Sequence, residues 1–192
     1  MEVDSPARET LSGIRTMTIE AYADTILPGE KRFPGDVAVA GASPGPGAAV
    51  CGAVELLELT GSGLAPTLDA LVDALNDHAQ QYAAARCLRL DPGLPAFVAL
   101  AFEDRTVLVR TLTAPEHPER QLWVGLAMFS YMAFDSAAHR NTADAFAAGH
   151  PGLTFLGFRR PGPDGLYRFP RFSYGRQLAG THPRTTQTGD PA

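Results

Sequence analysis

Two side chains near the end of a long apolar stretch have the types and spacing of an acid–base pair. Asp135 and His139 are four residues apart, so on a helix they would lie on one face and could meet. A carboxylate that holds an imidazole orients it for proton transfer in many catalytic sites. The structural interpretation, which we favour, makes His139 a cation near a helix C-terminus and Asp135 its partner. Tyr131, Asp135 and His139 are kept as the lining of an alternative pocket.

The remaining histidines and the two cysteines form no recognisable metal-binding motif. Three histidines adjoin a proline, and no two have the spacing of a zinc site: His117, His150 and His182. His78 falls on the apolar stripe of a predicted helix, which indicates a hydrogen-bonded core residue rather than a ligand. Cys51 and Cys87 show no CxxC or Cys/His spacing and are expected to be buried. We therefore expect no metal site.

Motifs for phosphate binding and catalysis are weak or missing. The sequence contains no GxSxG, P-loop, GxGxxG or HExxH motif. The glycine-rich residues 41–47 precede a predicted helix, where free backbone N–H groups bind anions, but Pro44 and Pro46 remove two of those donors. We expect neither a phosphate site nor catalytic residues.

Residues 155–176 combine aromatic side chains with arginines, a composition enriched at protein interfaces. The prolines and glycines of this segment exclude a helix, and its aromatic rings are costly to leave in water. The segment either wraps its own bundle or binds a partner, and stacking on RNA is a third option that the net charge of -5 disfavours. The expected partner-binding residues are Phe158, Arg159, Arg160, Tyr167, Phe169, Arg171, Phe172 and Tyr174.

These residues must be positioned by helices, because apolar residues recur at helical spacing and only residues 153–158 could form a strand. Helices are predicted at residues 18–26, 47–59, from Pro66 to Tyr82, 96–112, 118–140 and 142–147. Val50 is expected to point inward from the second helix, and Arg105 to lie on the polar strip of the fourth. The helix at 118–140 is apolar on nearly every face, which places it in the middle of a bundle.

The length and composition suit one domain with a hydrophobic core, since 45% of the 192 residues are hydrophobic and 19% are charged. We expect an all-α, single-domain helical bundle around the hydrophobic helix at 118–140. A long loop rich in proline and glycine is expected at 28–47. Residues 1–17 are predicted to be a flexible N-terminal segment, 18–180 the helical domain with an extended C-terminal wrap at 155–180, and 181–192 a disordered tail.

The charge balance and the apolar runs restrict the partners and the location. A net charge of -5, from 16 basic and 21 acidic residues, argues against a nucleic-acid binder and a polybasic membrane-surface protein. No apolar run reaches the roughly 20 residues that cross a bilayer. Residues 1–16 lack the apolar core of a signal peptide. We expect a cytoplasmic protein without membrane insertion.

Three stretches resemble the small (gamma) subunit family of gluconate 2-dehydrogenase, the companions of flavin-dependent GMC-type dehydrogenases. They are the helix that ends at Ile26-Leu27-Pro28-Gly29, Gly41-Ala42 with the helix at 47–58, and Leu156-Gly157-Phe158 with Pro161-Gly162. The predicted helices at 97–112 and 123–139 fall where that family has helices. The family's twin-arginine export signal and Gly-Gly-Asn run are missing, and Arg159-Arg160 interrupts the last motif.

The resemblance implies a helical, non-catalytic companion of a flavoprotein. The leading expectation is an accessory subunit that binds and stabilises a flavin-dependent oxidoreductase, with FAD on the partner and no cofactor bound by this chain. The alternative is a small enzyme or ligand-binding protein of a bacterial natural-product biosynthetic pathway, with its pocket near Tyr131, Asp135 and His139.

Overall fold

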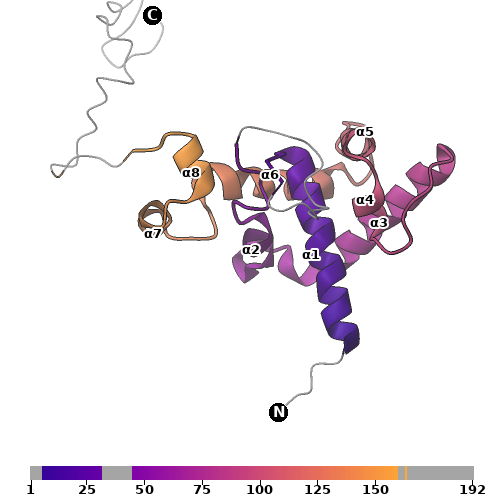
Figure 1. Cartoon of the computed structure of the whole chain (residues 1–192), viewed down its shortest axis with the longest axis horizontal. Helices are drawn as coiled ribbons and strands as arrows, with labels where there is room; N and C mark the ends of the chain where they lie inside the picture. The colour runs from indigo at the N-terminus through magenta and orange to yellow at the C-terminus, as the bar shows by residue number, and fades with distance from the viewer. Residues whose placement is uncertain (1–5, 32–44, 160–162, 164–192) are drawn as a thin grey trace, which may run out of the picture. The chain divides into compact units, whose positions relative to one another are not determined.

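The computed structural model describes residues 6–31, 45–159 and 163, and within these ranges the regular elements are all helices (Figure 1). The helices form a single all-α domain, as the sequence predicts. This compact unit ends at Phe158, and of the unit that begins at Arg159 the structure describes only Arg159 and Pro163. Most of the predicted wrap at 155–180 and all of the predicted tail at 181–192 lie outside the described residues.

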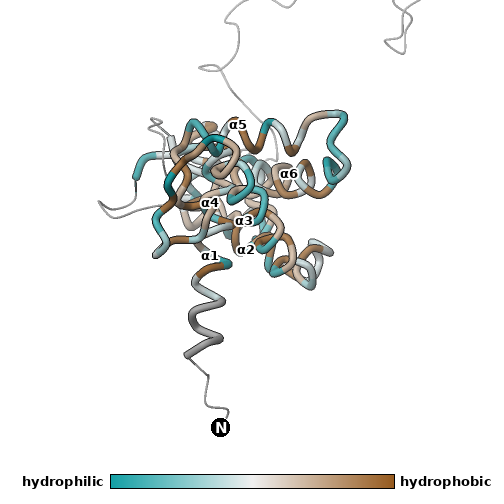
Figure 2. Tube along the Cα trace, turned by 90° about the vertical axis from the view of Figure 1, so that its right-hand side faces the viewer, coloured by the Kyte–Doolittle hydropathy of each residue, from teal (hydrophilic) through white to brown (hydrophobic). Residues whose placement is uncertain are grey.

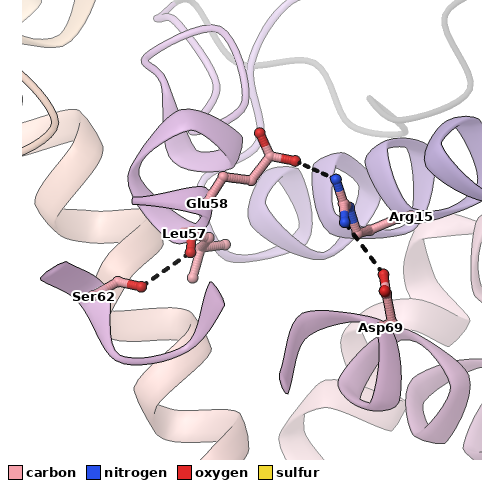
Figure 3. A network of polar contacts seen from close by, with 5 residues as sticks. All are labelled: Arg15, Leu57, Glu58, Ser62 and Asp69. Carbon is pink, nitrogen blue, oxygen red and sulfur yellow. Dashed lines mark hydrogen bonds and ion pairs between the residues drawn. The ribbon is translucent and has the colours of Figure 1, made fainter. Parts of the chain in front are cut away.

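Helix α1 (Pro6–Ile26) begins earlier than the predicted start at residue 18, so the expectation of a flexible segment at 1–17 is wrong from Pro6 onward. Arg15 explains part of the difference, because its guanidinium is held by two other helices (Figure 3). Nη2 lies 2.9 Å from Glu58 Oε1 at the end of α2 (Ala53–Glu58), and Nη1 lies 3.3 Å from Asp69 Oδ1 at the start of α3 (Leu68–Ala85). Such tertiary partners are invisible to local sequence patterns.

The loop between α1 and α2 is closed at its base. Ala48 N–H donates to the carbonyl of Leu27 at 3.0 Å, and a Cβ added to Gly29 would overlap the backbone of Gly47. Residues 32–44 of the predicted loop at 28–47 lie outside the described residues. Turns at 48–52 precede α2, and for this reason Val50 is exposed and not inward-facing as predicted.

The predicted helix at 96–112 is divided into α4 (Ala96–Ala99) and α5 (Phe102–Leu112). Leu100 is buried with extended backbone, at φ −66° and ψ 143°. Its carbonyl accepts a hydrogen bond from Arg105 Nε at 3.1 Å. The break thus accompanies a buried arginine that is hydrogen-bonded to the backbone of Leu100.

Two short 3-10 turns, Thr60–Ser62 and Ala65–Thr67, connect α2 to α3, and Ser62 Oγ donates to the Leu57 carbonyl at 3.0 Å (Figure 3).

Helix α6 (Arg120–Ser136) runs across the unit between α5 and α8 and also packs against α1 and α2 (Figure 1). It ends before the predicted Arg140, because Ala137 adopts a left-handed conformation with φ 51°.

Three aromatic rings pack together in the core. The rings of Tyr22 and Phe97 have centroids 6.2 Å apart, and those of Tyr22 and Trp123 6.4 Å apart. All three side chains are fully buried, and Tyr22 Oη donates to the Trp123 carbonyl at 2.7 Å.

Two short helices follow. Helix α7 (Thr142–Ala147) has the predicted bounds and is capped by Asn141, whose Oδ1 accepts from the N–H of Ala143 at 2.9 Å. Residues 153–158, a possible strand in the sequence, instead contain the end of helix α8 (Pro151–Phe155) and the turn that follows it. His150 starts this helix, because its Nδ1 accepts the N–H of Leu153 at 3.4 Å and proline follows at the first helical position.

The core is built from the inner faces of α1, α3, α4, α5 and α6. Figure 2 shows hydrophobic and hydrophilic residues alternating along the helices, as expected for elements that bury one face. Among the described helices, none combines the length and the apolarity that a membrane span requires.

Candidate functional site

Three groups that can bind a cation or move a proton meet where α3 approaches the start of α6. His78 lies on α3, His117 lies in the turn after α5, and Glu119 is the residue before α6. His78 Nε2 lies 2.8 Å from Glu119 Oε2. One ligand-type atom from each of the three side chains lies within 4.8 Å of the others. We call these three residues the His78 cluster.

The His78 cluster is fixed to the core by Trp123, one turn into α6. Trp123 Nε1 donates to Glu119 Oε2 at 3.1 Å, and the Trp123 ring meets the His78 ring edge-on with centroids 5.8 Å apart. The ring centroids of His117 and His78 are 5.7 Å apart. His117 Nδ1 accepts a hydrogen bond from the backbone N–H of Glu119 at 3.2 Å. Because Trp123 is fully buried, these contacts hold the cluster in one arrangement.

The electrostatics of the His78 cluster favour a charged carboxylate. The hydrogen bond from His78 lowers the pKa of Glu119; partial desolvation raises this pKa but is outweighed, and the N–H of Trp123 lowers it further. Glu119 is therefore an anion at neutral pH. It lies close to the imidazole rings of His78 and His117, and all three side chains are half-buried. Such a group can hold a cation or share a proton.

Sequence reasoning did not find the His78 cluster. His78 is hydrogen-bonded as predicted, but it is half-buried and its partner Glu119 is 41 positions away. The expectation of no metal site considered only local spacing, which cannot detect a set assembled from α3 and the α5–α6 turn. The one local signal is the pair His117 and Glu119, which flank Pro118 just before an apolar helix.

The predicted pairing of Asp135 with His139 on one helix face is wrong, because α6 ends at Ser136 and Ala137 turns the chain away. Tyr131 and Asp135 are exposed on α6. His139 is instead half-buried, with its ring against Gly52, where an added Cβ would overlap it. The three residues of the alternative pocket therefore lie in different surroundings.

His139 has a different neighbour, His150, with ring centroids 5.7 Å apart. His150 is buried and its Nε2 donates to the Cys51 carbonyl at 2.9 Å, while His139 Nδ1 is buried without a hydrogen-bond partner among the described residues. Burial lowers the pKa of His139, with smaller effects from the charges of Arg140 and His150 in the same direction and of Glu55 in the other. His139 is therefore neutral at neutral pH.

The two cysteines differ in their surroundings. Cys51 is buried as predicted, and burial raises the pKa of its thiol to about 11. Cys87 is exposed, contrary to the prediction, because it follows the last turn of α3 with a left-handed φ of 55°. Neither cysteine is in a disulfide.

Arg105 is also misplaced by the sequence pattern, which puts it on a polar strip. Its side chain is 3% exposed, and burial lowers the pKa of the guanidinium while the charge of Asp24 raises it. Asp24 is buried too, and its Oδ1 accepts the N–H of Ala49 at 2.9 Å. These two opposite charges both lie inside the core, where the charge of Asp24 favours the charged guanidinium.

The side of α6 that faces away from the core is apolar. Residues 121–134 contain no charged side chain. Three residues at helical spacing form what we call the outer face of α6: Val124, Met128 and Tyr131. Met128 is 52% exposed and Tyr131 is 50% exposed, whereas Trp123 and Leu126 on the other side are buried. Helix α6 is central as predicted, but one side of it remains uncovered by the described residues.

Exposed apolar side chains also lie at the end of α8 and directly after it, where the predicted partner-binding segment begins. They are Phe155, Leu156 and Phe158, and Phe155 lies beside Phe134 of α6 with ring centroids 6.1 Å apart. Phe158 and Arg159 are exposed, as partner binding requires. The other predicted partner-binding residues lie outside the described residues: Arg160, Tyr167, Phe169, Arg171, Phe172 and Tyr174.

The chain belongs to the family of unknown function DUF5987, whose family model matches residues 13–192. No curated protein and no solved structure matches the chain.

Proposed function

We propose that this DUF5987 member is a non-catalytic accessory subunit that binds and stabilises a flavin-dependent oxidoreductase of the GMC type. The observation that carries the proposal is the outer face of α6, an uncharged helical surface in the middle of the domain. We further propose that the chain binds no cofactor for this function and that FAD is held by the partner.

The composition and exposure of α6 support a binding role. A helix that is apolar on all sides is normally buried on all sides. Helices α1, α2, α5 and α8 cover its inner side, yet Met128 and Tyr131 are half-exposed on the other. Contiguous exposed apolar surface marks interaction sites in soluble proteins. Methionine adapts to varied partner surfaces, and tyrosine is enriched at interfaces.

The kind of partner follows from the sequence resemblance. The collinear stretches described above resemble those of companions of flavin-dependent dehydrogenases, among them the turn at Leu156-Gly157-Phe158. This turn follows α8 directly, and Leu156 and Phe158 are 47% and 48% exposed. We expect the outer face of α6 and the residues after α8 to contact the same oxidoreductase.

Co-purification from the native host tests this function. We expect the affinity-tagged chain to retain a partner whose eluate shows a flavin spectrum, with FAD and chain in equal amounts. Met128→Glu places a charge on the outer face and should abolish retention of the flavoprotein. Val107→Glu is the matched control, because Val107 is an apolar residue of similar exposure, 41%, on another helix, α5.

Two results would contradict the proposal. One is an eluate of the unmodified chain without flavin, and the other is equal retention of the flavoprotein by Met128→Glu and the unmodified chain. Turnover of a small molecule by the isolated chain would favour the alternative, an enzyme or ligand-binding protein.

A further inference from the structure

We propose that His78, His117 and Glu119 form a binding site for a divalent metal ion and that this ion is zinc. The proposal is independent of partner binding, because the His78 cluster lies at the junction of α3 and α6 and includes no residue of the outer face of α6.

The donor atoms suit zinc in number and type. Two imidazoles and one carboxylate are a ligand set used by zinc sites that keep a fourth position open for water or another ligand. Calcium and magnesium prefer sites made of oxygen atoms, so two nitrogen donors select a transition metal. Among the described residues, these three form the only group of three His, Cys, Asp or Glu side chains whose donor atoms come this close together.

The distances are compatible with binding after a small adjustment. Zinc bonds of about 2.0–2.2 Å in a tetrahedron place ligand atoms roughly 3.3 Å apart. The donor atoms of the cluster already lie within 4.8 Å of one another, and His78 Nε2 and Glu119 Oε2 are 2.8 Å apart. The ion would take the place of the proton between these two atoms. A neutral His78 imidazole would then carry its single N–H on Nδ1 while Nε2 binds the ion, and only an imidazolium would in addition release a proton to solvent.

The contacts around the cluster orient its ligands. The indole N–H of Trp123 donates to Glu119 Oε2, as second-shell donors to metal-bound carboxylates do. The Glu119 N–H holds the His117 ring through a bond of 3.2 Å to Nδ1, which ligation through this nitrogen would replace. Because all three side chains are half-buried, an ion can reach them from solvent.

The competing interpretation is that the hydrogen bond between His78 and Glu119 only attaches α6 to α3. A purely structural contact has no need of His117, whose ring contributes no hydrogen bond to the other two side chains in the described structure. His117→Ala therefore separates the two interpretations, because it removes a ligand and keeps the bond between His78 and Glu119.

Calorimetric titration of the full-length, untagged chain with zinc chloride tests the site. We expect one zinc ion per chain, and at least a tenfold loss of affinity, about the minimum for disturbing a metal site, in His117→Ala. His139→Gln and Cys87→Ser are matched controls, since both residues could bind zinc adventitiously, and both variants should keep the affinity of the unmodified chain.

Thermal unfolding with and without zinc gives a second readout. Zinc should raise the Tm of the unmodified chain, because a ligand that binds only the folded state stabilises it, and this rise should be lost in His117→Ala. If His117→Ala does not fold, Glu119→Gln replaces it, because the amide oxygen can still accept from Trp123 and His78. Absence of stoichiometric zinc binding, or equal affinity in the ligand variants and the unmodified chain, would overturn the proposal.

Discussion

At the scale of single residues, removal of the buried Arg105 side chain should be costly. Arg105→Ala leaves the Leu100 carbonyl without its donor and leaves the buried Asp24 without a nearby positive charge. Removing one member of a buried charge pair typically costs about 3–5 kcal/mol, and we expect a loss in that range. Urea unfolding would measure it against Arg110→Ala, an exposed change on the same helix that should cost less than about 0.5 kcal/mol. Equal stabilities of the two variants would show that the guanidinium is solvated.

His139 should make stability depend on pH, because burial lowers its pKa in the folded chain. Above the usual histidine value of about 6.5 the group is neutral in both states and has no effect on stability. As the pH falls through that value, the unfolded chain takes up a proton that the folded chain resists, so the folded state is progressively destabilised. His139→Gln should therefore lose less Tm than the unmodified chain on acidification. Parallel Tm profiles would exclude this residue as the cause.

Individual residues also explain what the sequence could not predict about the candidate site. The general tendency of free cysteine to be buried placed Cys51 correctly and Cys87 incorrectly. Asp135 and His139 were paired incorrectly, because nothing in the type of Ala137 indicates a left-handed turn. The His78 cluster joins a side chain of α3 to two residues of the turn before α6, and no local pattern records that contact.

At the scale of elements, α6 should respond differently to changes on its two sides. Trp123 is fully buried, so Trp123→Ala should cost about 3–5 kcal/mol from lost packing and a cavity. Met128→Ala on the outer face should change the stability of the isolated chain by less than about 0.5 kcal/mol. Guanidinium unfolding of both variants would measure this. A large cost for Met128→Ala would mean that another part of the chain covers the outer face.

The elements themselves were predictable where local signals coincide with tertiary packing. The apolar stripe of α3 gave a correct position, because a hydrophobic periodicity acts within one helix. Helix α7 has the predicted bounds, and the structure shows that Asn141 caps it. The break between α4 and α5 was missed because it accompanies a tertiary feature, the buried Arg105 that donates to the Leu100 carbonyl. The early start of α1 was missed because Arg15 is held by Glu58 and Asp69.

At the scale of the whole molecule, the arginines after α8 should serve association and not folding. Arg159 is exposed, and exposed charges contribute little to folding stability. The double variant Arg159→Ala with Arg160→Ala should therefore weaken retention of the flavoprotein and leave the Tm of the isolated chain nearly unchanged. Differential scanning calorimetry and the co-purification assay would measure the two effects. Unfolding of the double variant would instead show that this segment covers its own core.

The different surroundings of the two thiols provide an internal reporter of conformational opening. Cys87 is exposed, so a maleimide should label it at once, whereas Cys51 is buried with a thiol pKa of about 11. Cys51 also lies beside Gly52 and His150, at the place where α2, α8 and the segment after α6 meet. The slow labelling of Cys51 therefore measures the rate at which this junction opens. A bound partner that stabilises the junction would slow this labelling without contacting either sulfur.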